Sequence, residues 1–584
     1  MRPPALGLLV TVVLIGRLAC ADESASPDVM PPPSPPSPPR FSVLPQQWQR
    51  DVPPSDAVVV PRPLTRDDET QRVTLQEAIG LALQNNPGIA AKRLEPTRVE
   101  QDVLQTQSQY DPIASGALLY AESITPNASA LADTRTSNIN ERTWTTDLSK
   151  LLRTGTRLSL SYEWDRLDNN ARFFTLRPEY TPQAGFSLVQ PLLRDFGWDF
   201  SYLVVRIAER TADAALYQYE ADVANFVKQV IDTYYTVMGA RAVLQVQQEA
   251  EALATRTVEE NMARVRVGLL PPVAILEARA DASARHDDVI RAENALVVTR
   301  QRLAQLCFHR PDGTFVPRTL EPTEYEGAEE VEIDADRTLA GALDQRAEVM
   351  ASAQGVRARQ LNERVASNAL LPRFDMVGGY GVNGLSGRGR PFFSERNVDG
   401  RCTFISEGNW RCPGDATPFA GSKGASWDRL ASGSFHAYNF GVQLEVPIDN
   451  AAARAQHTRS RLELNQAELN HRELLSQVTL EVRQSVADVL SSRQRIDASR
   501  VARELAEENL RSQQKRFEVG NATTKDLLDF QQRLTSARAA EVQANFDYAV
   551  AVAAWRRAEG TLLDRYHVLL EHPKRRAVPW FARF

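Results

Sequence analysis

Two kinds of hydrophobic pattern alternate along the chain from about residue 73 onward. Long segments carry apolar residues at helical spacing, and short segments between them alternate apolar and polar residues one by one. In residues 451–517 the apolar positions are separated by multiples of seven, and only Arg503 interrupts the series. The series consists of Leu475, Val482, Val489, Ile496, Leu510 and Phe517. A heptad repeat of this length predicts a helix that packs along neighbouring helices.

The helical segments predict two long rods, each followed by a turn and a second helix. At 1.5 Å per residue the segment above would be about 100 Å long, and a rod of similar length is expected over residues 200–265. Both rods end at a Val-Gly pair, and a glycine just past a helix end takes the left-handed conformation with little strain. The turns are Val267, Gly268, Leu269 and Val519, Gly520, Asn521. Two antiparallel helical hairpins follow, a pattern that alone is typical of a plain coiled coil.

The short alternating segments predict strands with one apolar and one polar face. In residues 156–165, leucine, tyrosine and tryptophan alternate with serine, glutamate and aspartate, and residues 438–446 repeat the arrangement. Alternation over about ten residues is typical of a transmembrane barrel strand, although a soluble sandwich gives the same pattern. The polar stretches 123–140 and 169–182 are expected to be long loops between such strands.

The same order of patterns occurs twice. Three pairs of matching segments stand in the same order along the chain, at nearly constant offsets. The pairs are Gly268 with Gly520 (520 − 268 = 252), residues 112–120 with 372–380 (372 − 112 = 260), and residues 185–191 with 441–447 (441 − 185 = 256). Self-similarity at a fixed displacement predicts two copies of one structural unit.

Residues 1–21 have the features of a secretory signal peptide. Arg2 supplies a positive start, residues 6–15 are apolar, and Ala19-Cys20-Ala21 fits a cleavage site. Cleavage after Ala21 is the favoured interpretation, and lipidation of Cys20 after cleavage at Ala19 is the alternative. In either case the mature protein is expected to leave the cytoplasm.

No later segment reaches the roughly 18 to 20 apolar residues that a membrane-spanning helix needs. A closed barrel of strands is then the expected way across a membrane, because it pairs every backbone polar group. Residues 22–65 are rich in proline and are expected to form an extended tether. Residues 564–584 are a C-terminal tail to which the sequence assigns no role.

Composition and chemistry argue against an enzyme or a nucleic-acid binder. The 68 basic and 74 acidic residues give a net charge of −6, which does not favour nucleic acid as a partner. The chain has no CxxC or HExxH motif and no catalytic constellation, so no metal, cofactor or catalytic residue is expected. Cys402 and Cys412 are predicted to form a disulfide in an oxidising compartment, with two free thiols as the alternative.

Several motifs together resemble the TolC-type outer-membrane efflux protein family. They are residues 75–87 (LQEAIGLALQNNP), residues 190–193 (QPLL) and the two Val-Gly turns. The similarity extends over about residues 73–563. It implies an α+β membrane protein in which long antiparallel helical hairpins form an α-barrel tunnel and strands from three chains form a transmembrane β-barrel.

The resemblance also implies a domain order. Residues 73–335 would be the first repeat, with strands in 112–190 and a tip at Gly268. Residues 336–563 would be the second, with strands in 372–447 and a tip at Gly520.

The number of strands departs from the family pattern. Members of this family contribute four strands per chain, but here residues 144–152 and 156–165 add strand-like segments. The extra hairpin either enlarges the barrel, which is the favoured interpretation, or lies outside it.

The function that the resemblance implies is a homotrimeric channel in outer-membrane lipid. It would be the passive exit duct of a tripartite efflux or type I secretion system, served by a periplasmic adaptor and an inner-membrane transporter. The periplasmic gate would consist of Asp526, Asp529 and Phe517, and the adaptor would dock at Val267–Leu269 and Val519–Asn521. The alternative is a non-conducting periplasmic coiled-coil adaptor or spacer.

Overall fold

The structure is a computed structural model that describes residues 71–127, 135–171, 174–308, 320–323, 331–389, 403–406, 409–411 and 417–570. All of these residues belong to one unit, Arg66–Phe584. The predicted signal peptide and tether, Cys20 and the proposed disulfide between Cys402 and Cys412 lie outside the described residues.

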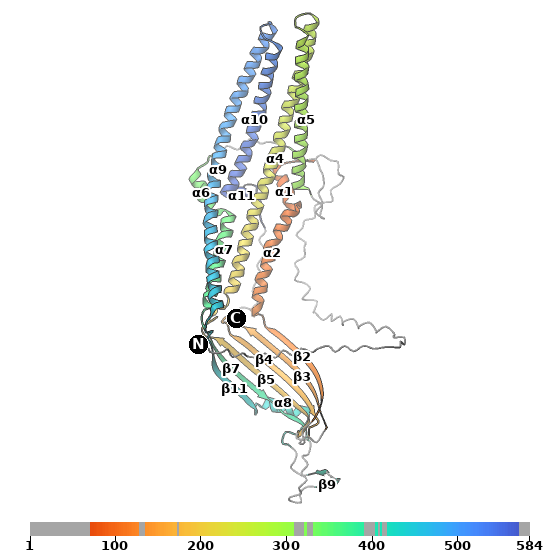
Figure 1. The fold of residues 1–584 in the computed structure, drawn as a ribbon, viewed down its shortest axis with the longest axis vertical. Coiled ribbons are helices and arrows are strands. Elements are labelled where there is room, and N and C mark those ends of the chain that lie inside the picture. Colours follow the sequence, from red (N-terminus) through yellow and green to blue (C-terminus); the bar gives the residue numbers. More distant parts are fainter. Residues whose placement is uncertain are drawn as a thin grey trace, which may run out of the picture. The chain divides into compact units, whose positions relative to one another are not determined.

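Two helical hairpins dominate the fold (Figure 1). The first pairs α4 (Leu203–Arg266) with α5 (Val273–Cys307), and the second pairs α9 (Ala451–Glu518) with α10 (Thr524–Glu559). Helix α4 has 64 residues and α9 has 68. Both rods predicted from the hydrophobic pattern are therefore confirmed, and their ends lie within three residues of the prediction.

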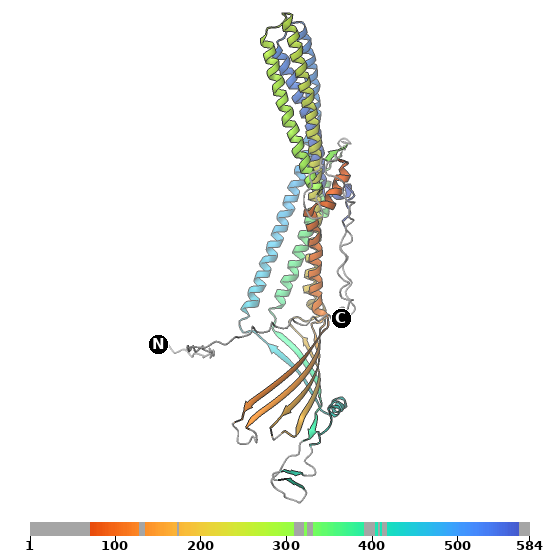
Figure 2. The same cartoon turned by 90° about the vertical axis from the view of Figure 1, so that its right-hand side faces the viewer.

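Shorter helices pack along the rods. They are α1 (Leu75–Asn85), α2 (Pro87–Gln107), the 3₁₀ helix η2 (Ser108–Tyr110), α3 (Trp198–Ser201), α6 (Ala335–Gln345), α7 (Ala347–Asn368) and α11 (Leu562–Arg565). Helix α2 packs on α4, and α7 packs on both α4 and α9. Near the sheet, the helices therefore follow the order α9, α7, α4, α2, and Figure 2 shows α9, α7 and α2 separated in this sequence.

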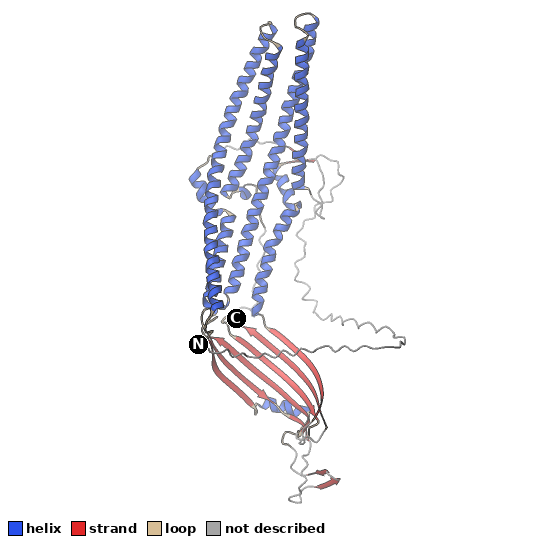
Figure 3. Ribbon diagram, in the orientation of Figure 1, coloured by secondary structure: helices blue, strands red, loops and turns tan. Residues whose placement is uncertain are grey.

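One antiparallel sheet follows the order β11-β7-β5-β4-β3-β2 (Figure 3). Its strands are β2 (Ile113–Pro126), β3 (Thr136–Leu151), β4 (Arg157–Asn169), β5 (Leu176–Pro191), β7 (Arg373–Asn383) and β11 (His436–Glu445). Strand β8 (Ser386–Gly389) pairs with β5 beyond the end of β7. Two small ladders complete the set: β1 (Gln71–Val73) with β6 (Leu320–Pro322), and β9 (Thr403–Ser406) with β10 (Asn409–Arg411).

The register gives the sheet one apolar and one polar face. Residues that pair directly across strands share a face, so each row of partners can be followed from edge to edge. One row consists of Ala114, Leu148, Leu160, Phe186, Tyr380 and Tyr438. The next row, on the other face, consists of Ser115, Asp147, Ser161, Gly185, Gly381 and Ala437. The predicted two-faced pattern is therefore continuous over six strands.

The apolar face is largely exposed. The five large side chains of the first row retain between 44% and 78% of their accessible surface. Helix α8 (Lys423–Ser432) covers part of this face, where Trp427 stacks on Tyr162 at 5.1 Å and Lys423 lies over the ring of Trp164. An apolar surface of this extent marks a site that contacts lipid or another protein.

Two loops are shorter in the structure than the sequence pattern predicts. Strand β2 continues to Pro126 and pairs there with Thr136 of β3, within the stretch assigned to a loop over residues 123–140. Strand β5 begins at Leu176, so the stretch 169–182 is mostly strand as well. Polar side chains made these stretches look like loops, but a strand ladder is made by backbone groups and needs no apolar residue.

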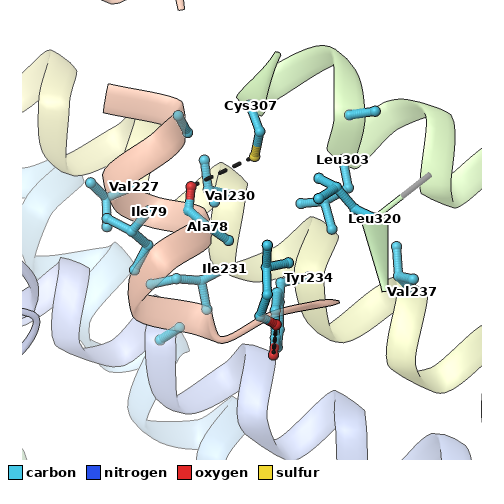
Figure 4. Packing of buried hydrophobic residues seen from close by; sticks show 14 of the residues in the cluster. Ala78, Ile79, Val227, Val230, Ile231, Tyr234, Val237, Leu303, Cys307 and Leu320 are labelled. Carbon is cyan, nitrogen blue, oxygen red and sulfur yellow. Dashed lines mark hydrogen bonds between the residues drawn. The ribbon is translucent and has the colours of Figure 1, made fainter. Parts of the chain in front are cut away.

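A buried core joins the short helix α1 to the rods α4 and α5 (Figure 4). The Tyr234 hydroxyl donates a hydrogen bond to the carbonyl of Val73 at 3.2 Å, and the Cys307 thiol donates to the carbonyl of Ala78 at 3.6 Å. Burial raises the pKa of Cys307 to about 12, so this thiol stays protonated. It is a packing residue and not a reactive one.

The heptad series packs as the sequence predicts. Its buried members are Val482, Val489, Leu510 and Phe517, and its partly buried members are Leu475 and Ile496. They form successive apolar clusters along α9. Because each cluster draws residues from other helices, α9 is fixed along its length by packing more than by helix propensity.

Candidate functional site at the hairpin tips

The two hairpin turns have the same backbone geometry. Gly268 and Gly520 have φ angles of 79° and 78°, in the left-handed region. The N–H of Leu269 donates to the carbonyl of Arg264 at 2.9 Å, and the N–H of Asn521 donates to that of Arg516 at 2.8 Å. These bonds satisfy carbonyls that a helix end leaves free, and the glycine conformation makes them possible.

Both turns present apolar side chains to solvent. Val267 and Leu269 are 69% and 73% exposed in the first turn, and Val519 is 71% exposed in the second. Asn521 is exposed beside Val519. The candidate docking residues therefore form two similar exposed ends, one on each hairpin.

Asp526 takes part in the N-terminal cap of α10. It completes a capping box in which the N–H of Thr523 donates to its carboxylate at 3.0 Å, while its own N–H donates to the Thr523 hydroxyl oxygen at 3.2 Å. The Thr523 hydroxyl also donates to the carboxylate, and these hydrogen bonds lower the pKa of Asp526. Asp529 lies three residues further along the helix and is exposed. At that spacing the two carboxylates share one side of α10.

Phe517 is buried inside the tip, whereas the two carboxylates are exposed. Its side chain is only 5% exposed and packs in a cluster with Leu510, Leu527 and Leu534. The guanidinium carbon of Arg264 lies 4.6 Å from the centre of the Phe517 ring. Because Arg264 belongs to α4, this cation–π contact joins the tips of the two hairpins.

A charged layer below the tips contains the residue that interrupts the heptad series. Arg503 of α9 pairs with Glu541 of α10 at 2.6 Å and with Glu507 at 3.2 Å. Arg538 of α10 then pairs with Glu507 at 3.0 Å and with Glu249 of α4 at 3.6 Å. Hydrogen bonding from Arg538 lowers the pKa of Glu507. Arg503 is thus part of a network that links both hairpins.

A second network lies near the start of α7. Arg346 is 3% exposed and pairs with Glu348 at 3.0 Å and with Glu481 of α9 at 2.8 Å. Arg557 of α10 binds both glutamates and donates to Asn225 of α4 at 2.8 Å. Burial disfavours the ionised form of Glu481, but the charges of Arg557 and Arg346 outweigh it and lower the pKa of Glu481. No sequence pattern indicates this cluster, because its members are far apart along the chain.

The polar face of the sheet carries four carboxylates on the β3–β4 hairpin. Glu141 pairs with Leu167, Asp147 with Ser161, Glu163 with Thr145, and Asp165 with Thr143, so all four project from one face. No helix among the described residues has the length and apolar character needed to cross a bilayer. Within the same residues, no group of three or more metal-ligating side chains is present.

Comparisons with known proteins give a consistent family and fold. A family model described as "Outer membrane efflux protein" matches residues 156–307 and 339–561. The chain is 22% identical over 389 residues to the outer membrane protein TolC of Vibrio cholerae, covering 65% of this chain and 77% of that protein.

Two solved structures share the fold at low sequence identity. The CmeC outer membrane channel of Campylobacter jejuni is 16% identical, with a TM-score of 0.57, and covers 85% of this chain and 90% of its own. The outer membrane protein VceC of Vibrio cholerae is also 16% identical, with a TM-score of 0.57, and covers 83% of this chain and 96% of its own.

Proposed function

Because the chain belongs to the outer membrane efflux protein family, whose members are outer-membrane channels and not enzymes, we propose that three copies form a passive exit duct. The sheets of the three copies would close into a β-barrel in outer-membrane lipid. The helical hairpins would continue that opening as a tunnel into the periplasm, ending at the tips. Each copy would supply both hairpins as two repeats of one unit, residues 73–335 and 336–563.

One observation carries this proposal: a sheet with a continuous exposed apolar face is joined directly to paired rods. Every residue of the edge strand β2 is exposed, and all but one residue of the other edge strand β11. An open sheet edge in lipid would leave backbone groups without partners, so the edges need neighbouring strands. Further copies of the chain supply those strands.

The assembly test is fractionation followed by electrophoresis and planar-bilayer recording. We expect the protein in the outer-membrane fraction, with heat-modifiable migration and discrete conductance steps. Recovery from the soluble periplasm, as a monomer without conductance, would instead support a coiled-coil adaptor or spacer.

We also propose that the tunnel is gated at its tip, by Asp526 and Asp529. Trimerisation would gather six carboxylates at one constriction, which favours cations and disfavours anions. The Asp529→Asn variant leaves the Thr523–Asp526 cap in place, and so removes charge without removing the helix cap. We expect weaker block by multivalent cations in Asp529→Asn, whereas Glu508→Asn, an exposed carboxylate of α9, should behave as wild type. Unchanged block in Asp529→Asn would place the constriction elsewhere.

The partners proposed here are a periplasmic adaptor and an inner-membrane transporter, in a tripartite efflux or type I secretion system. The exposed turns Val267–Leu269 and Val519–Asn521 are the proposed docking points, because they end both hairpins with the same backbone and an apolar surface. Cross-linking from cysteines at positions 269 and 521 should capture the adaptor in cells. A cysteine at position 462, on an exposed part of α9 far from the turns, should not.

A further inference from the structure

We infer that the barrel has six strands per chain, eighteen in the trimer, and not the four per chain and twelve in total that the family resemblance implies. The inference rests on the proposed trimeric channel and concerns the width of its membrane section. It follows from the position of the β3–β4 hairpin, from the two free edges of the sheet, and from the helices to which each strand is joined.

The β3–β4 hairpin is a full member of the sheet. Strand β3 pairs with β2 from Ile113↔Ser149 to Pro126↔Thr136, and β4 pairs with β5 from Arg157↔Val189 to Leu167↔Glu179. The hairpin thus separates β2 from β5 along nearly their whole length. Both pairings are long and lie inside the sheet, so trimer assembly could not easily replace them with pairings between chains.

The apolar and polar faces of the sheet both continue through the β3–β4 hairpin. On the apolar face, Trp144 and Trp164 pair with each other, and Trp144 also pairs with Leu118 of β2. On the polar face stand the carboxylates Asp147 and Glu163. A hairpin outside the barrel wall would expose the tryptophans to water or place the carboxylates in lipid, and both are costly. Within the barrel wall, the tryptophans would face lipid and the carboxylates would face the water in the lumen.

The two free edges fit one another. Six strands that alternate in direction leave β2 and β11 antiparallel, so β11 of one copy can extend the ladder through β2 of the next. Three copies then close an antiparallel barrel with an even number of strands, as bacterial outer-membrane barrels have. The exposure of both edge strands shows that nothing within the described chain covers them.

The helices need not change when the sheet widens. Strands β2, β5, β7 and β11 lead from or into α2, α3–α4, α7 and α9, in the same order as the helices themselves. Strands β3 and β4 join only other strands. Where the helices meet the sheet, each chain therefore contributes four helices and six strands.

The widths of the two walls support six strands. At about 4.8 Å between strands and a tilt of about 40°, each strand occupies about 6.3 Å of circumference. Eighteen strands then give a barrel about 36 Å across, and twelve give about 24 Å. A ring of twelve helices spaced about 8–10 Å apart is about 31–38 Å across. Eighteen strands match that ring, whereas twelve would narrow the duct by about 10 Å where it enters the membrane.

The width bears on what the membrane section can pass. Side chains reach about 5 Å inward from each wall, since packed sheets lie about 10 Å apart. The lumen would be about 26 Å wide with eighteen strands and about 14 Å with twelve. The membrane section is therefore wide enough for a folded peptide or small domain, and the tip would be the step that restricts passage.

Electron cryo-microscopy of the purified full chain in lipid nanodiscs tests the inference by counting strands in the wall. We expect a three-fold ring of eighteen strands about 36 Å across. The matched variant deletes residues 136–169, which joins β2 to β5 and should give twelve strands and about 24 Å. A wild-type trimer with twelve strands and the hairpin outside the wall overturns this inference but leaves the channel intact. Particles without a closed ring would refute the proposed function itself.

Discussion

Replacing Phe517 tests whether the tips of the two hairpins form one packed unit. The ring is 5% exposed, packs among leucines of α9 and α10, and lies under the guanidinium of Arg264 from the other hairpin. Removing it should loosen the tip and leave the core around α1 unchanged, because that cluster shares no residue with the tip.

Two substitutions separate the contributions of the ring. Truncating a buried phenylalanine to alanine costs about 3–5 kcal/mol, so Phe517→Ala should lose most of the local stability. Phe517→Leu keeps an apolar side chain of similar size and loses the cation–π contact, which costs about 0.5–1 kcal/mol because the Arg264 side chain is partly exposed. Since about 1.4 kcal/mol changes an equilibrium tenfold, local opening should increase about 150-fold or more in the first variant and about fivefold or less in the second.

Hydrogen exchange of backbone amides is the assay, because it reports local opening residue by residue. We expect faster exchange in residues 506–534 of Phe517→Ala, with amides near Cys307 unchanged. Leu505→Ala, at a position of α9 that is 61% exposed, is the control and should exchange as wild type. If Phe517→Ala matched this control, the ring would not hold the tips together, and the packing described here would be wrong.

Three further predictions concern the turn, the Glu481 network and the sheet. Gly520→Ala places an alanine in the left-handed backbone conformation and should destabilise the tip by about 1–2 kcal/mol, which would appear as faster proteolysis there. Gly341→Ala is the control: this position lies in the middle of α6 with open space around it, so the substitution should not weaken the fold. Folding lowers the pKa of Glu481, so this carboxylate stabilises the fold above its unfolded pKa, and that stabilisation is lost as the pH falls through the folded pKa. The free energy of unfolding of Glu481→Gln, measured in urea, should therefore depend less on pH below about 4.5 than that of wild type. Neutralising the four carboxylates of the β3–β4 polar face should lower cation selectivity, measured as a smaller reversal potential in a salt gradient.

The rods could be predicted closely because their signal is local and redundant. Six heptad positions all report the same helix face, so single exceptions do not shift the ends of α9. The strands gave a weaker signal, because the polar ends of β2 and β5 look like loops when only side chains are considered. Their pairing depends on backbone groups in partner strands, and the partners cannot be read from one segment alone.

The candidate site shows a different limit. Arg503 breaks the heptad series, and from the sequence it is a defect in the apolar seam of α9. In the structure it binds Glu541 of the neighbouring helix at 2.6 Å and shares Glu507 with Arg538, which reaches α4. An arginine at such a position is compatible with close packing only when carboxylates from the facing helices neutralise it, because an unpaired charge between helices would be costly. Periodicity along one helix can therefore show that a position is exceptional, but the reason lies on another helix, which for Arg503 is the carboxylate of Glu541 on α10, 38 residues further along the chain (541 − 503 = 38).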